Sequence, residues 1–299
     1  IAMDINQKIM GKNGLACVKM AKSLIKVPIG SRMPTVSELA NSNCIPVGTT
    51  HNALRTLIEY GAIEIIPRGH MGSFLVGKDV KKLLSIIGVQ YIFGAMPITE
   101  NKYFKGLASG IISQMNNEYN VPINLAYMRG SKTRIEMLIN GRYDFVIVSK
   151  MAANEYIKKN GGIDIVLNFG IFSYTQNYSL KFHNAGINEI KDGMKIGIDP
   201  CSIDQIKLSK DLCRKKKVEY IEILSSRMDD ELELGNIDAA LIYDDNIIYD
   251  DIPVDGSCAV LIVDSEKMEV AEIIRDLIDK KEIIEIQKQV VEGKIKPRY

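Results

Sequence analysis

The 299-residue sequence predicts an α/β protein in which a small N-terminal α+β module precedes a larger α/β domain built of two blocks. Three observations lead to this prediction. Helical periodicity over residues 13–58 gives way to two short β runs before residue 78. From Val89 onward, strands and helices alternate, which is typical of a mostly parallel sheet covered by helices. A Leu-x-x-Gly-x-x-Asp pattern followed by an apolar strand occurs twice, beginning at Leu138 and at Leu232.

The N-terminal module begins with three predicted helices. Residues 13–25 carry apolar side chains at helical spacing. A short helix follows from Thr35 to Asn41, because Thr35 and Glu38 have the spacing of a capping box. The next helix starts near Pro46–Val47 and ends at Gly61, a residue type that favours helix ends. Its predicted buried face comprises Ala53, Leu54, Leu57 and Ile58.

Two short β runs complete the module. Ile63–Ile66 and Ser73–Val76 flank the glycine-containing segment 68–72, which predicts a hairpin. Helix, turn, helix and hairpin in this order define a winged helix-turn-helix, a fold that places its second helix in the DNA major groove. We therefore assign residues 1–78 to a DNA-binding domain and 79–299 to an effector-binding domain.

The exposed face of the second helix supplies the predicted base-reading residues. Asparagine and arginine read adenine and guanine through paired hydrogen bonds. Arg32 and the hairpin tip are placed for phosphate or minor-groove contact, whereas the alternative is a solvated helix face and an ordinary hairpin. The predicted DNA-binding residues are Arg32, Thr49, Thr50, His51, Asn52, Arg55, Arg68, Gly69 and His70.

This stretch resembles the winged-helix domain of GntR-type bacterial transcription regulators. The resemblance rests on Met33-Pro34, Glu38-Leu39-Ala40, Thr49-Thr50, Gly61-Ala62-Ile63 and Arg68-Gly69, in that order. The segment Arg-Gly-His-Met-Gly-Ser-Phe-Leu-Val, residues 68–76, is most similar to the YhfZ-like regulators of that group. The resemblance implies DNA binding. The chain differs from it by carrying Ser37, Gly48 and Asn52 where GntR proteins usually have arginine.

Charge and composition agree with a DNA reader attached to a sensor. The net charge is +1, but residues 1–78 hold nine Lys/Arg and four acidic residues, a net +5, and the remainder carries −4. Five scattered cysteines indicate neither a disulfide framework nor a zinc site. No long apolar run and no export signal is evident, so we expect a cytoplasmic protein without a membrane segment.

The larger domain is predicted from alternating apolar runs and amphipathic stretches. A short linker over 78–87 precedes it, and an extended, tyrosine-containing segment over 172–182 interrupts it. Predicted strands cover 91–93, 123–127, 145–148, 163–167, 195–198, 219–223, 239–243 and 258–263. Predicted helices cover 102–119, 132–140, 151–159, 203–214, 228–234, 266–279 and 281–292.

The repeated pattern describes a helix that ends at glycine, a turn held by aspartate and a buried strand. Two such copies in two α/β blocks resemble the two-lobed type 2 periplasmic-binding-protein fold, which also serves as the effector domain of bacterial regulators. The resemblance implies a lobe I formed by residues 89–171 and 257–299 and a lobe II formed by 172–256, with the last strand returning to lobe I.

We expect the ligand between the lobes, where strands end and helices begin. Free N–H groups at helix starts favour anions, and Arg129 and Lys132 add positive charge, so the ligand is predicted to be a small anionic molecule. The alternative is that Ser131 and Ser202 are plain helix caps and that the basic side chains are solvated. The predicted ligand-binding residues are Thr99, Arg129, Ser131, Lys132, Ser149, Tyr174, Asp199, Ser202 and Tyr243.

No catalytic or metal-binding motif is evident, and only His183 of the three histidines lies in the larger domain. The sequence therefore predicts a ligand-responsive, homodimeric transcription regulator with no enzymatic activity, cofactor or metal. Its partners are double-stranded operator DNA and a small-molecule effector. One alternative is an enzyme on the two-lobed fold with an autoregulatory DNA-binding module. The other is a transport-type solute binder, which the fused winged helix disfavours.

Overall fold

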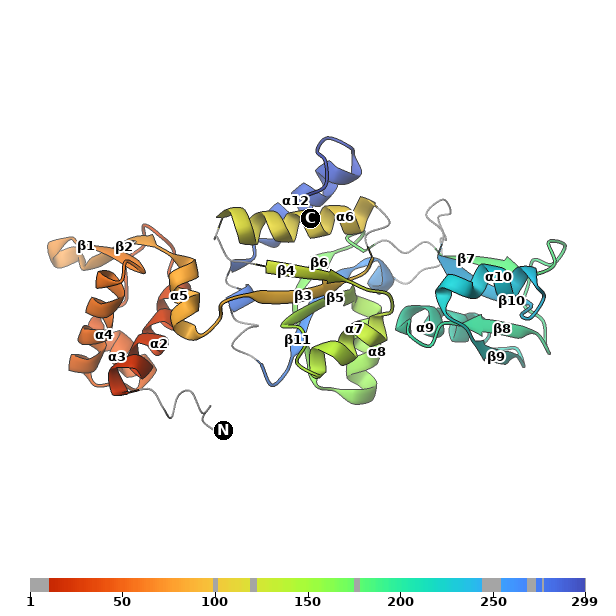
Figure 1. Cartoon of the computed structure of the whole chain (residues 1–299), viewed down its shortest axis with the longest axis horizontal. Coiled ribbons are helices and arrows are strands. Elements are labelled where there is room, and N and C mark those ends of the chain that lie inside the picture. The colour runs from red at the N-terminus through yellow and green to blue at the C-terminus, as the bar shows by residue number, and fades with distance from the viewer. Residues whose placement is uncertain are drawn as a thin grey trace. The chain divides into compact units, whose positions relative to one another are not determined.

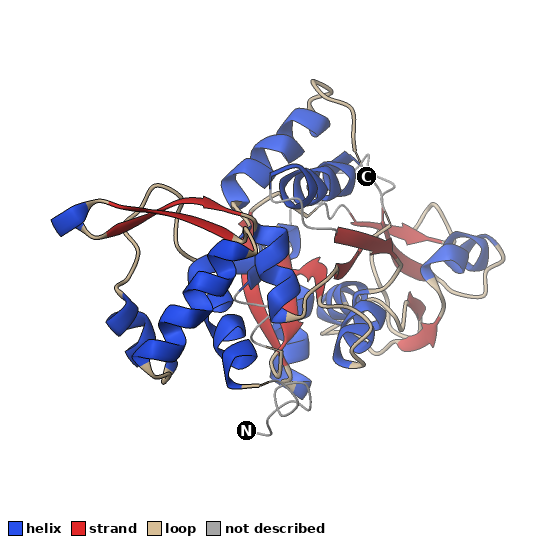
Figure 2. Cartoon of the chain, turned by 60° about the vertical axis from the view of Figure 1, so that its left-hand side comes forward, coloured by secondary structure: helices blue, strands red, loops and turns tan. Residues whose placement is uncertain are grey.

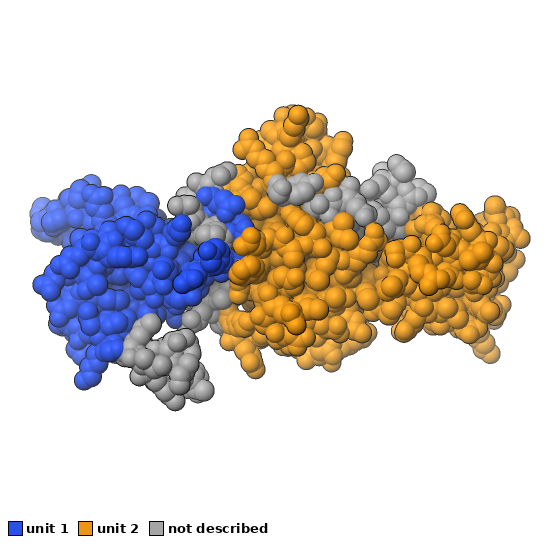
Figure 3. Space-filling model, in the orientation of Figure 1, with its two compact units in different colours: residues 1–92, 114–123 blue, residues 93–113, 124–299 orange. Residues whose placement is uncertain are grey.

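The computed structural model describes residues 11–98, 102–118, 123–174, 178–243, 254–267, 273–275 and 277–298. The chain forms two compact units (Figure 3). Unit 1 comprises residues 1–92 and 114–123, and unit 2 comprises 93–113 and 124–299. The overall class is mixed α/β, as the sequence predicts.

Unit 1 contains the predicted helix-turn-helix and hairpin. Its elements are α2 (Lys12–Ile25), α3 (Val36–Asn43), α4 (Val47–Glu59), β1 (Ile63–Pro67), β2 (Ser73–Lys78) and α5 (Val80–Ile87). The segment expected as a linker is the helix α5, which is capped by Asp79 and packs against α2. The core of the unit is therefore built by α2, α4 and α5 together.

Local chemistry fixes both ends of the helix-turn-helix. The Thr35 hydroxyl accepts the backbone N–H of Glu38 at 3.2 Å, and the Glu38 carboxylate accepts that of Thr35 at 2.7 Å, which completes the predicted capping box. The bonds that the Glu38 carboxylate accepts from the backbone N–H and from the hydroxyl of Thr35 lower the pKa of Glu38. At the turn, Cys44 adopts the left-handed conformation, with φ 53° and ψ 51°. Helix α4 ends as predicted, because Gly61 has a φ of +68°.

The hairpin is an antiparallel pair of β1 and β2 with a short helical turn, η1 (Gly69–Met71), at its tip (Figure 2). Residues 31–33 join the hairpin as well. The N–H of Leu75 donates to the carbonyl of Ser31 and the N–H of Met33 to that of Ser73. An isolated bridge also links Arg32 to Phe74. The segment before α3 is thereby fixed to the first half of β2, next to the tip of the hairpin.

Unit 2 contains two sheets. The first has five strands in the order β4-β3-β5-β11-β6, and we call it and its helices the five-stranded lobe. Its strands are β3 (Ile92–Met96), β4 (Ile123–Tyr127), β5 (Phe145–Ser149), β6 (Ile163–Gly170) and β11 (Ala259–Asp264). Its helices are α6 (Lys102–Ile112), α7 (Ser131–Ile139), α8 (Lys150–Asn160) and α12 (Lys280–Val291). Figure 1 shows α6 and α12 along one face of the sheet and α7 and α8 along the other.

The second sheet has four strands in the order β7-β10-β8-β9, and we call it and its helices the four-stranded lobe. Its strands are β7 (Tyr178–Phe182), β8 (Lys195–Ile198), β9 (Glu219–Glu222) and β10 (Ala239–Tyr243). Its helices are α9 (Ile203–Leu212), α10 (Met228–Glu233) and the short turn η3 (Ser225–Arg227). Strand β11 follows this lobe in the sequence, yet it pairs antiparallel with β5 and β6 of the five-stranded lobe.

The two copies of the repeated pattern make the same contacts. Asp144 accepts the N–H of Phe93 at 2.9 Å, and Asp238 accepts that of Lys195 at 2.7 Å. Each aspartate thus ties its own strand, β5 or β10, to the parallel neighbour, β3 or β8. The central strand order is equivalent in the two lobes, which explains the repeat physically.

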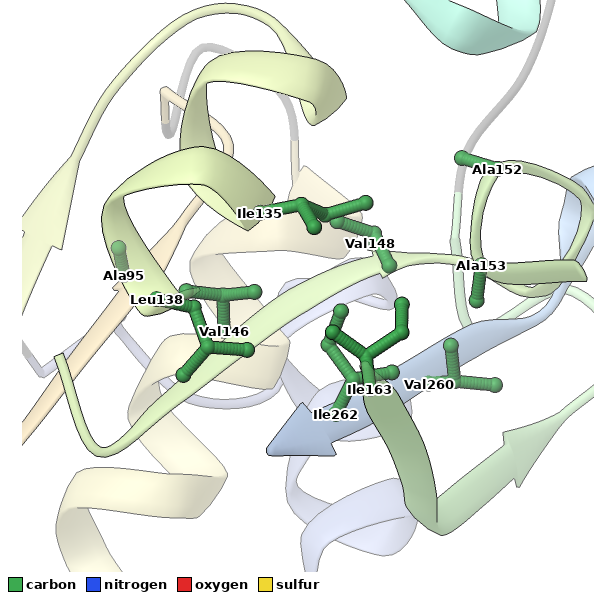
Figure 4. Packing of buried hydrophobic residues seen from close by; sticks show 10 residues of the cluster. All are labelled: Ala95, Ile135, Leu138, Val146, Val148, Ala152, Ala153, Ile163, Val260 and Ile262. Carbon is green, nitrogen blue, oxygen red and sulfur yellow. The ribbon is translucent and has the colours of Figure 1, made fainter. Parts of the chain in front are cut away.

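The core of the five-stranded lobe is formed by side chains of α7, α8 and the sheet (Figure 4). Ile135 and Leu138 come from α7, and Ala152 and Ala153 from α8. They meet apolar residues of β5, β6 and β11, namely Val146, Val148, Ile163, Val260 and Ile262. Burial on both faces explains why these strands are continuous apolar runs in the sequence.

Some predicted elements differ in the structure. The helix expected over 102–119 ends at Ile112 and continues as a π-helical segment, η2 (Ser113–Glu118). Residues 268–272 and 276 of the helix expected over 266–279 lie outside the described residues. So do residues 246–253 of the segment 246–256, which we expect to be the second crossing between the lobes. Ile58, expected in the core, is 45% exposed because it lies at the edge of the apolar stripe of α4.

Candidate functional site

The exposed face of α4 carries three of the predicted base-reading residues. His51, Asn52 and Arg55 are exposed, and Thr49 is half-buried. Arg55 forms an ion pair with Glu59, at 3.6 Å between Nε and Oε1, and both side chains are about two-thirds exposed. Such a surface pair stabilises by roughly 0.3–0.5 kcal/mol, so it does not prevent Arg55 from contacting DNA.

Thr50 requires a correction. Its side chain is fully buried, and its hydroxyl donates to the carbonyl of Pro46 at 3.2 Å. The reason is spacing, because residues 50, 53, 54 and 57 form a single helical stripe that faces the core of unit 1. Thr50 therefore belongs to the packed side of α4 and does not reach a DNA base from this position.

Two arginines lie at the wing. The guanidinium carbon of Arg68 is 4.6 Å from the centre of the Phe74 ring, a cation–π contact that holds the side chain along the hairpin. Arg32 lies beside Gly72, where an added Cβ would be 3.0 Å from its Nε. Arg32, Arg68, Gly69 and His70 are all exposed. The fold therefore places positive charge on the wing, as a phosphate-binding surface requires.

The second candidate site is a cavity of about 320 Å³ within unit 2, lined by both lobes. This volume lies at the small end of the range for ligand pockets, roughly 300–1,000 Å³. The polar lining residues are Arg129, Ser131, Arg134, Tyr174, Tyr178, Asp199, Ser202, Asp204, Gln205, Ser225 and Asp229. The other lining residues are Pro97, Ile98, Phe104, Met128, Gly130, Met228, Leu241 and Ile242.

Arg134 of α7 is the most unusual group in this cavity because its side chain is only 2% exposed. Its Nε donates to the carbonyl of Ile147 at 3.0 Å and its Nη1 to that of Met128 at 2.8 Å. Its Nη2 donates to the hydroxyl of Tyr174 at 3.2 Å. In the described part of the chain, the other two guanidinium N–H groups have no acceptor and no carboxylate lies within ion-pairing distance.

Tyr174 positions this guanidinium from the other side. Its ring packs edge-on against Phe104, with 4.9 Å between ring centres. Burial raises the pKa of Tyr174 far above its ordinary value, so the phenol is neutral and accepts the Arg134 bond while keeping its own proton. The neutral phenol brings no negative charge, so the electrostatic interaction of Arg134 with a carboxyl group is that with Asp204, which forms no ion pair with it at 4.0 Å or less.

The side chain of Asp204, in α9 of the four-stranded lobe, contacts residues of the five-stranded lobe. Its carboxylate accepts the hydroxyls of Ser131, at 3.4 Å, and of Ser149. The Ser131 oxygen in turn accepts the N–H of Ile203 at 3.0 Å, and the N–H of Lys132 donates to the carbonyl of Cys201 at 3.0 Å. These bonds join the starts of α7 and α9.

Burial raises the pKa of Asp204, although the bond from Ser149 and the charge of Arg134 oppose that shift. The protonated, neutral carboxyl is therefore favoured to higher pH than for an ordinary aspartate. Ser131 and Ser149, which the sequence suggests for a ligand anion, bind an acid of the chain itself. Ser149 also caps α8 through the N–H of Ala152, is fully buried and does not line the cavity.

Asp199 shapes the other side of the cavity. Its carboxylate accepts the N–H of Cys201 at 2.9 Å and the hydroxyl of Ser225. Its backbone N–H donates to the side chain of Gln205 at 2.9 Å, and the Gln205 amide also donates to the carbonyls of Gly197 and Leu241. Ser202 caps α9 by accepting the N–H of Gln205 at 3.3 Å, the role that the sequence offers as the alternative to ligand binding.

The structure thus brings five of the predicted ligand residues to one cavity, namely Arg129, Ser131, Tyr174, Asp199 and Ser202. Lys132 is exposed and 3.9 Å from Glu136, outside the lining. Ser131 does not cap its own helix, because α7 begins after Gly130 without a side-chain cap. Thr99 lies outside the described residues, as does the side chain of Tyr243.

Sequence reasoning missed Arg134 and Asp204. Both lie inside predicted helices, where a charged residue is usually solvated. The available signal was their place in the first turn of a helix that follows a strand, the region where ligands bind in α/β folds.

The described residues contain no group of three or more His, Cys, Asp and Glu side chains that would hold a metal ion. All five cysteines are free. Within the described chain, no helix combines the length and the apolar character needed to cross a bilayer.

Comparison with known proteins identifies both parts of the chain. A family model described as the YhfZ C-terminal domain matches residues 79–299, and a helix-turn-helix domain model matches residues 28–75. The chain belongs to the YhfZ family. The uncharacterized protein YhfZ of Escherichia coli K12 is 29% identical over 304 residues, covering 96% of this chain and 98% of that protein.

Solved structures agree with the assignment to the YhfZ family. The crystal structure of YhfZ from Shigella flexneri matches with a TM-score of 0.63 and 26% identity, covering 73% of this chain and 97% of that one. The periplasmic aliphatic sulphonate binding protein SsuA of Escherichia coli matches with a TM-score of 0.51 at 12% identity, covering 68% of this chain and 75% of that one. The YhfZ-family chain therefore joins a helix-turn-helix domain to a fold of the two-lobed periplasmic-binding-protein type, as expected for a DNA-binding regulator with a ligand-binding domain.

Proposed function

We propose that this YhfZ-family protein is a transcription regulator whose two-lobed domain binds a small metabolite bearing an anionic group and thereby changes its affinity for operator DNA. The observation that carries the ligand part is Arg134, a buried guanidinium on the cavity wall without a carboxylate partner in the described chain. An unpaired buried charge is costly, and an anionic ligand would neutralise it.

The DNA part rests on the exposed face of α4 and on the wing. Asn52 and Arg55 project from the helix that a winged helix-turn-helix places in the major groove, and Arg32 and Arg68 provide phosphate contacts. We propose a GntR-type reader that works as a homodimer in the cytoplasm, with two recognition helices in successive major grooves of a palindromic operator.

Ligand binding is coupled to DNA binding through the equilibrium between lobe arrangements. A ligand that contacts both lobes favours the closed arrangement of the lobes. Binding thereby changes the fraction of protein whose helix-turn-helix domains are positioned to bind DNA. This role needs no catalytic step and no cofactor, so we propose a regulator rather than an enzyme.

The DNA part is tested by titrating the full-length protein against a fluorescent duplex from its own upstream region at low salt. Arg55→Ala and Asn52→Ala are each expected to weaken specific binding by roughly 5- to 150-fold, the equivalent of about 1–3 kcal/mol per paired base contact. Arg142→Ala is the matched control, because Arg142 is an exposed arginine of unit 2. Unchanged binding by both variants would refute the base-reading assignment.

The ligand part is tested by thermal denaturation with a panel of phosphates, sulphonates and carboxylates. A compound that binds only the folded state at 100 times its Kd stabilises the protein by about 2.7 kcal/mol. Arg129→Gln, at the exposed part of the cavity lining, should reduce that stabilisation, whereas Arg142→Gln should not. Stabilisation by neutral compounds alone would contradict an anionic ligand.

A further inference from the structure

The charged side chains that line the cavity are segregated by lobe. The five-stranded lobe contributes Arg129 and Arg134 and no described acidic residue. The four-stranded lobe contributes Asp199, Asp204 and Asp229 and no described basic residue. A ligand with negative charge alone would satisfy one wall and be repelled by the other.

The three aspartates are not equivalent. Asp229 is 60% exposed and pairs with Lys181 at 3.0 Å, so its charge is balanced at the surface. Asp204 accepts the hydroxyls of Ser131 and Ser149 and interacts electrostatically with Arg134, so its partners come from the chain itself. Neither of these carboxyls therefore requires a charged ligand group.

Asp199 is different. It is only 4% exposed and lies on the cavity wall, and no Lys, Arg or His of the described chain reaches ion-pairing distance of it. Its carboxylate accepts from the N–H of Cys201 and from Ser225, which fixes its orientation. Two oxygens offer about four acceptor sites, so further donors can be accommodated.

The cavity therefore contains a buried cation, Arg134, and a buried carboxylate, Asp199, on opposite lobes, and neither forms an ion pair in the described chain. The lining also contains the apolar side chains of Phe104, Met128, Met228 and Leu241. We infer that the ligand is a small zwitterion of the amino-acid class, whose anionic group binds at Arg134 and whose ammonium group binds at Asp199. This inference rests on the proposed function and specifies the ligand of the same cavity.

A zwitterion also explains how binding would close the lobes. Each of its charged ends satisfies a group on a different lobe, so both contacts form only when the two walls face each other. The differential contact needed to shift a conformational equilibrium is then supplied by the ligand itself.

The test uses the full-length protein and thermal denaturation with three matched sets of compounds. The first set contains α-, β- and γ-amino acids, the second the same acids without the amino group, and the third the same amines without the carboxylate. We expect at least one amino acid to stabilise the protein, with its deamino and decarboxy counterparts roughly 10- to 100-fold weaker, as for loss of a hydrogen bond to a charged group.

Variants locate the ammonium site. Asp199→Asn keeps the acceptor oxygen for Cys201 and removes the charge, so it should abolish the preference for the amino acid over its deamino counterpart. Asp192→Asn is the matched control, because Asp192 also accepts a backbone N–H, that of Lys217, but lies outside the cavity. Circular dichroism is used to check that both variants fold. The comparison of the three compound sets on the wild-type protein does not depend on either variant.

The outcomes separate this inference from the proposed function. Equal stabilisation by an amino acid and its deamino counterpart would overturn the zwitterion. So would a panel in which no amino acid binds but phosphates or sulphonates do, which would leave an anionic effector in place. No stabilisation by any charged compound would refute both the zwitterion and the anionic ligand. A preserved amino-acid preference in Asp199→Asn would overturn the assignment of the ammonium site.

Discussion

Gly130→Ala provides a sharp test of the contact between the two lobes. Gly130 has φ +80° and ψ 119°, a conformation that side chains rarely adopt. A Cβ built there would lie 2.7 Å from both the Cβ and the carbonyl oxygen of Cys201, at the start of α9. The obstacle includes backbone, so the lobes must move apart rather than a side chain rotate.

The size of the effect follows from this geometry. Ordinary van der Waals contact begins near 3.4 Å, so Cys201 must retreat by about 0.7 Å. That displacement breaks the 3.0 Å bonds from Lys132 N–H to Cys201 and from Ile203 N–H to Ser131. Two such bonds are worth about 1–3 kcal/mol together. The backbone strain of alanine adds roughly 1–3 kcal/mol.

Gly161→Ala separates the two contributions. Gly161 also has a positive φ, +66°, but a Cβ there meets nothing within 4 Å, so this variant carries the strain alone. Urea denaturation followed by circular dichroism should show Gly130→Ala less stable than Gly161→Ala by about 1–3 kcal/mol. Hydrogen exchange over 131–134 and 201–205 should also accelerate in Gly130→Ala alone. Equal stability and equal exchange in the two variants would refute the reasoning.

Three further outcomes are expected. Because burial raises the folded-state pKa of Asp204, its contribution to the free energy of unfolding is complete below the ordinary pKa and is lost as pH rises through the raised value. The urea midpoint of Asp204→Asn should therefore rise relative to that of the wild-type protein as pH increases above the ordinary pKa of aspartate. A difference that stays constant with pH would contradict the raised pKa. Thr35→Ala removes the hydroxyl of the capping box with Glu38 and should destabilise unit 1 by about 0.5–2 kcal/mol, measured by thermal denaturation. Unchanged stability would contradict the role of Thr35 as a cap. Gly106→Ala should destabilise unit 2 by roughly 1–3 kcal/mol in the same measurement, because the added Cβ would lie 2.8 Å from the backbone of Gln287. This loss is expected although alanine has the higher helix propensity. A gain in stability would show that α6 and α12 can separate without cost.

The helix-turn-helix module was largely predictable because its signals are local. The capping box of Thr35 and Glu38 and the glycine that ends α4 each depend on residues a few positions apart. The same holds for the alternating strands and helices of the body and for the Leu-x-x-Gly-x-x-Asp repeat, whose aspartates perform one structural role in both lobes. Thr50 was placed on the exposed face of the helix, whereas the stripe that it forms with Ala53, Leu54 and Leu57 requires burial.

The candidate ligand site was only partly predictable. Arg129, Tyr174, Asp199 and Ser202 could be chosen because they follow strands or precede helices. Nothing in the local sequence shows that Arg134 is buried without a carboxylate partner in the described chain, since its neighbours Ile147 and Tyr174 come from other segments.

By itself, the sequence determined the order of the secondary-structure elements and the helix-turn-helix module, because periodicity and capping operate within a few residues. The two-lobed plan followed from the resemblance of its two α/β blocks to a known fold. Only the tertiary structure decided which charges meet in the cavity. Ser131 and Ser149 hold Asp204 from more than fifty residues away, and a contact of that range is set by how two lobes close on each other. The pairing of a basic wall with an acidic wall is therefore a property of the fold, and no single stretch of the chain carries it.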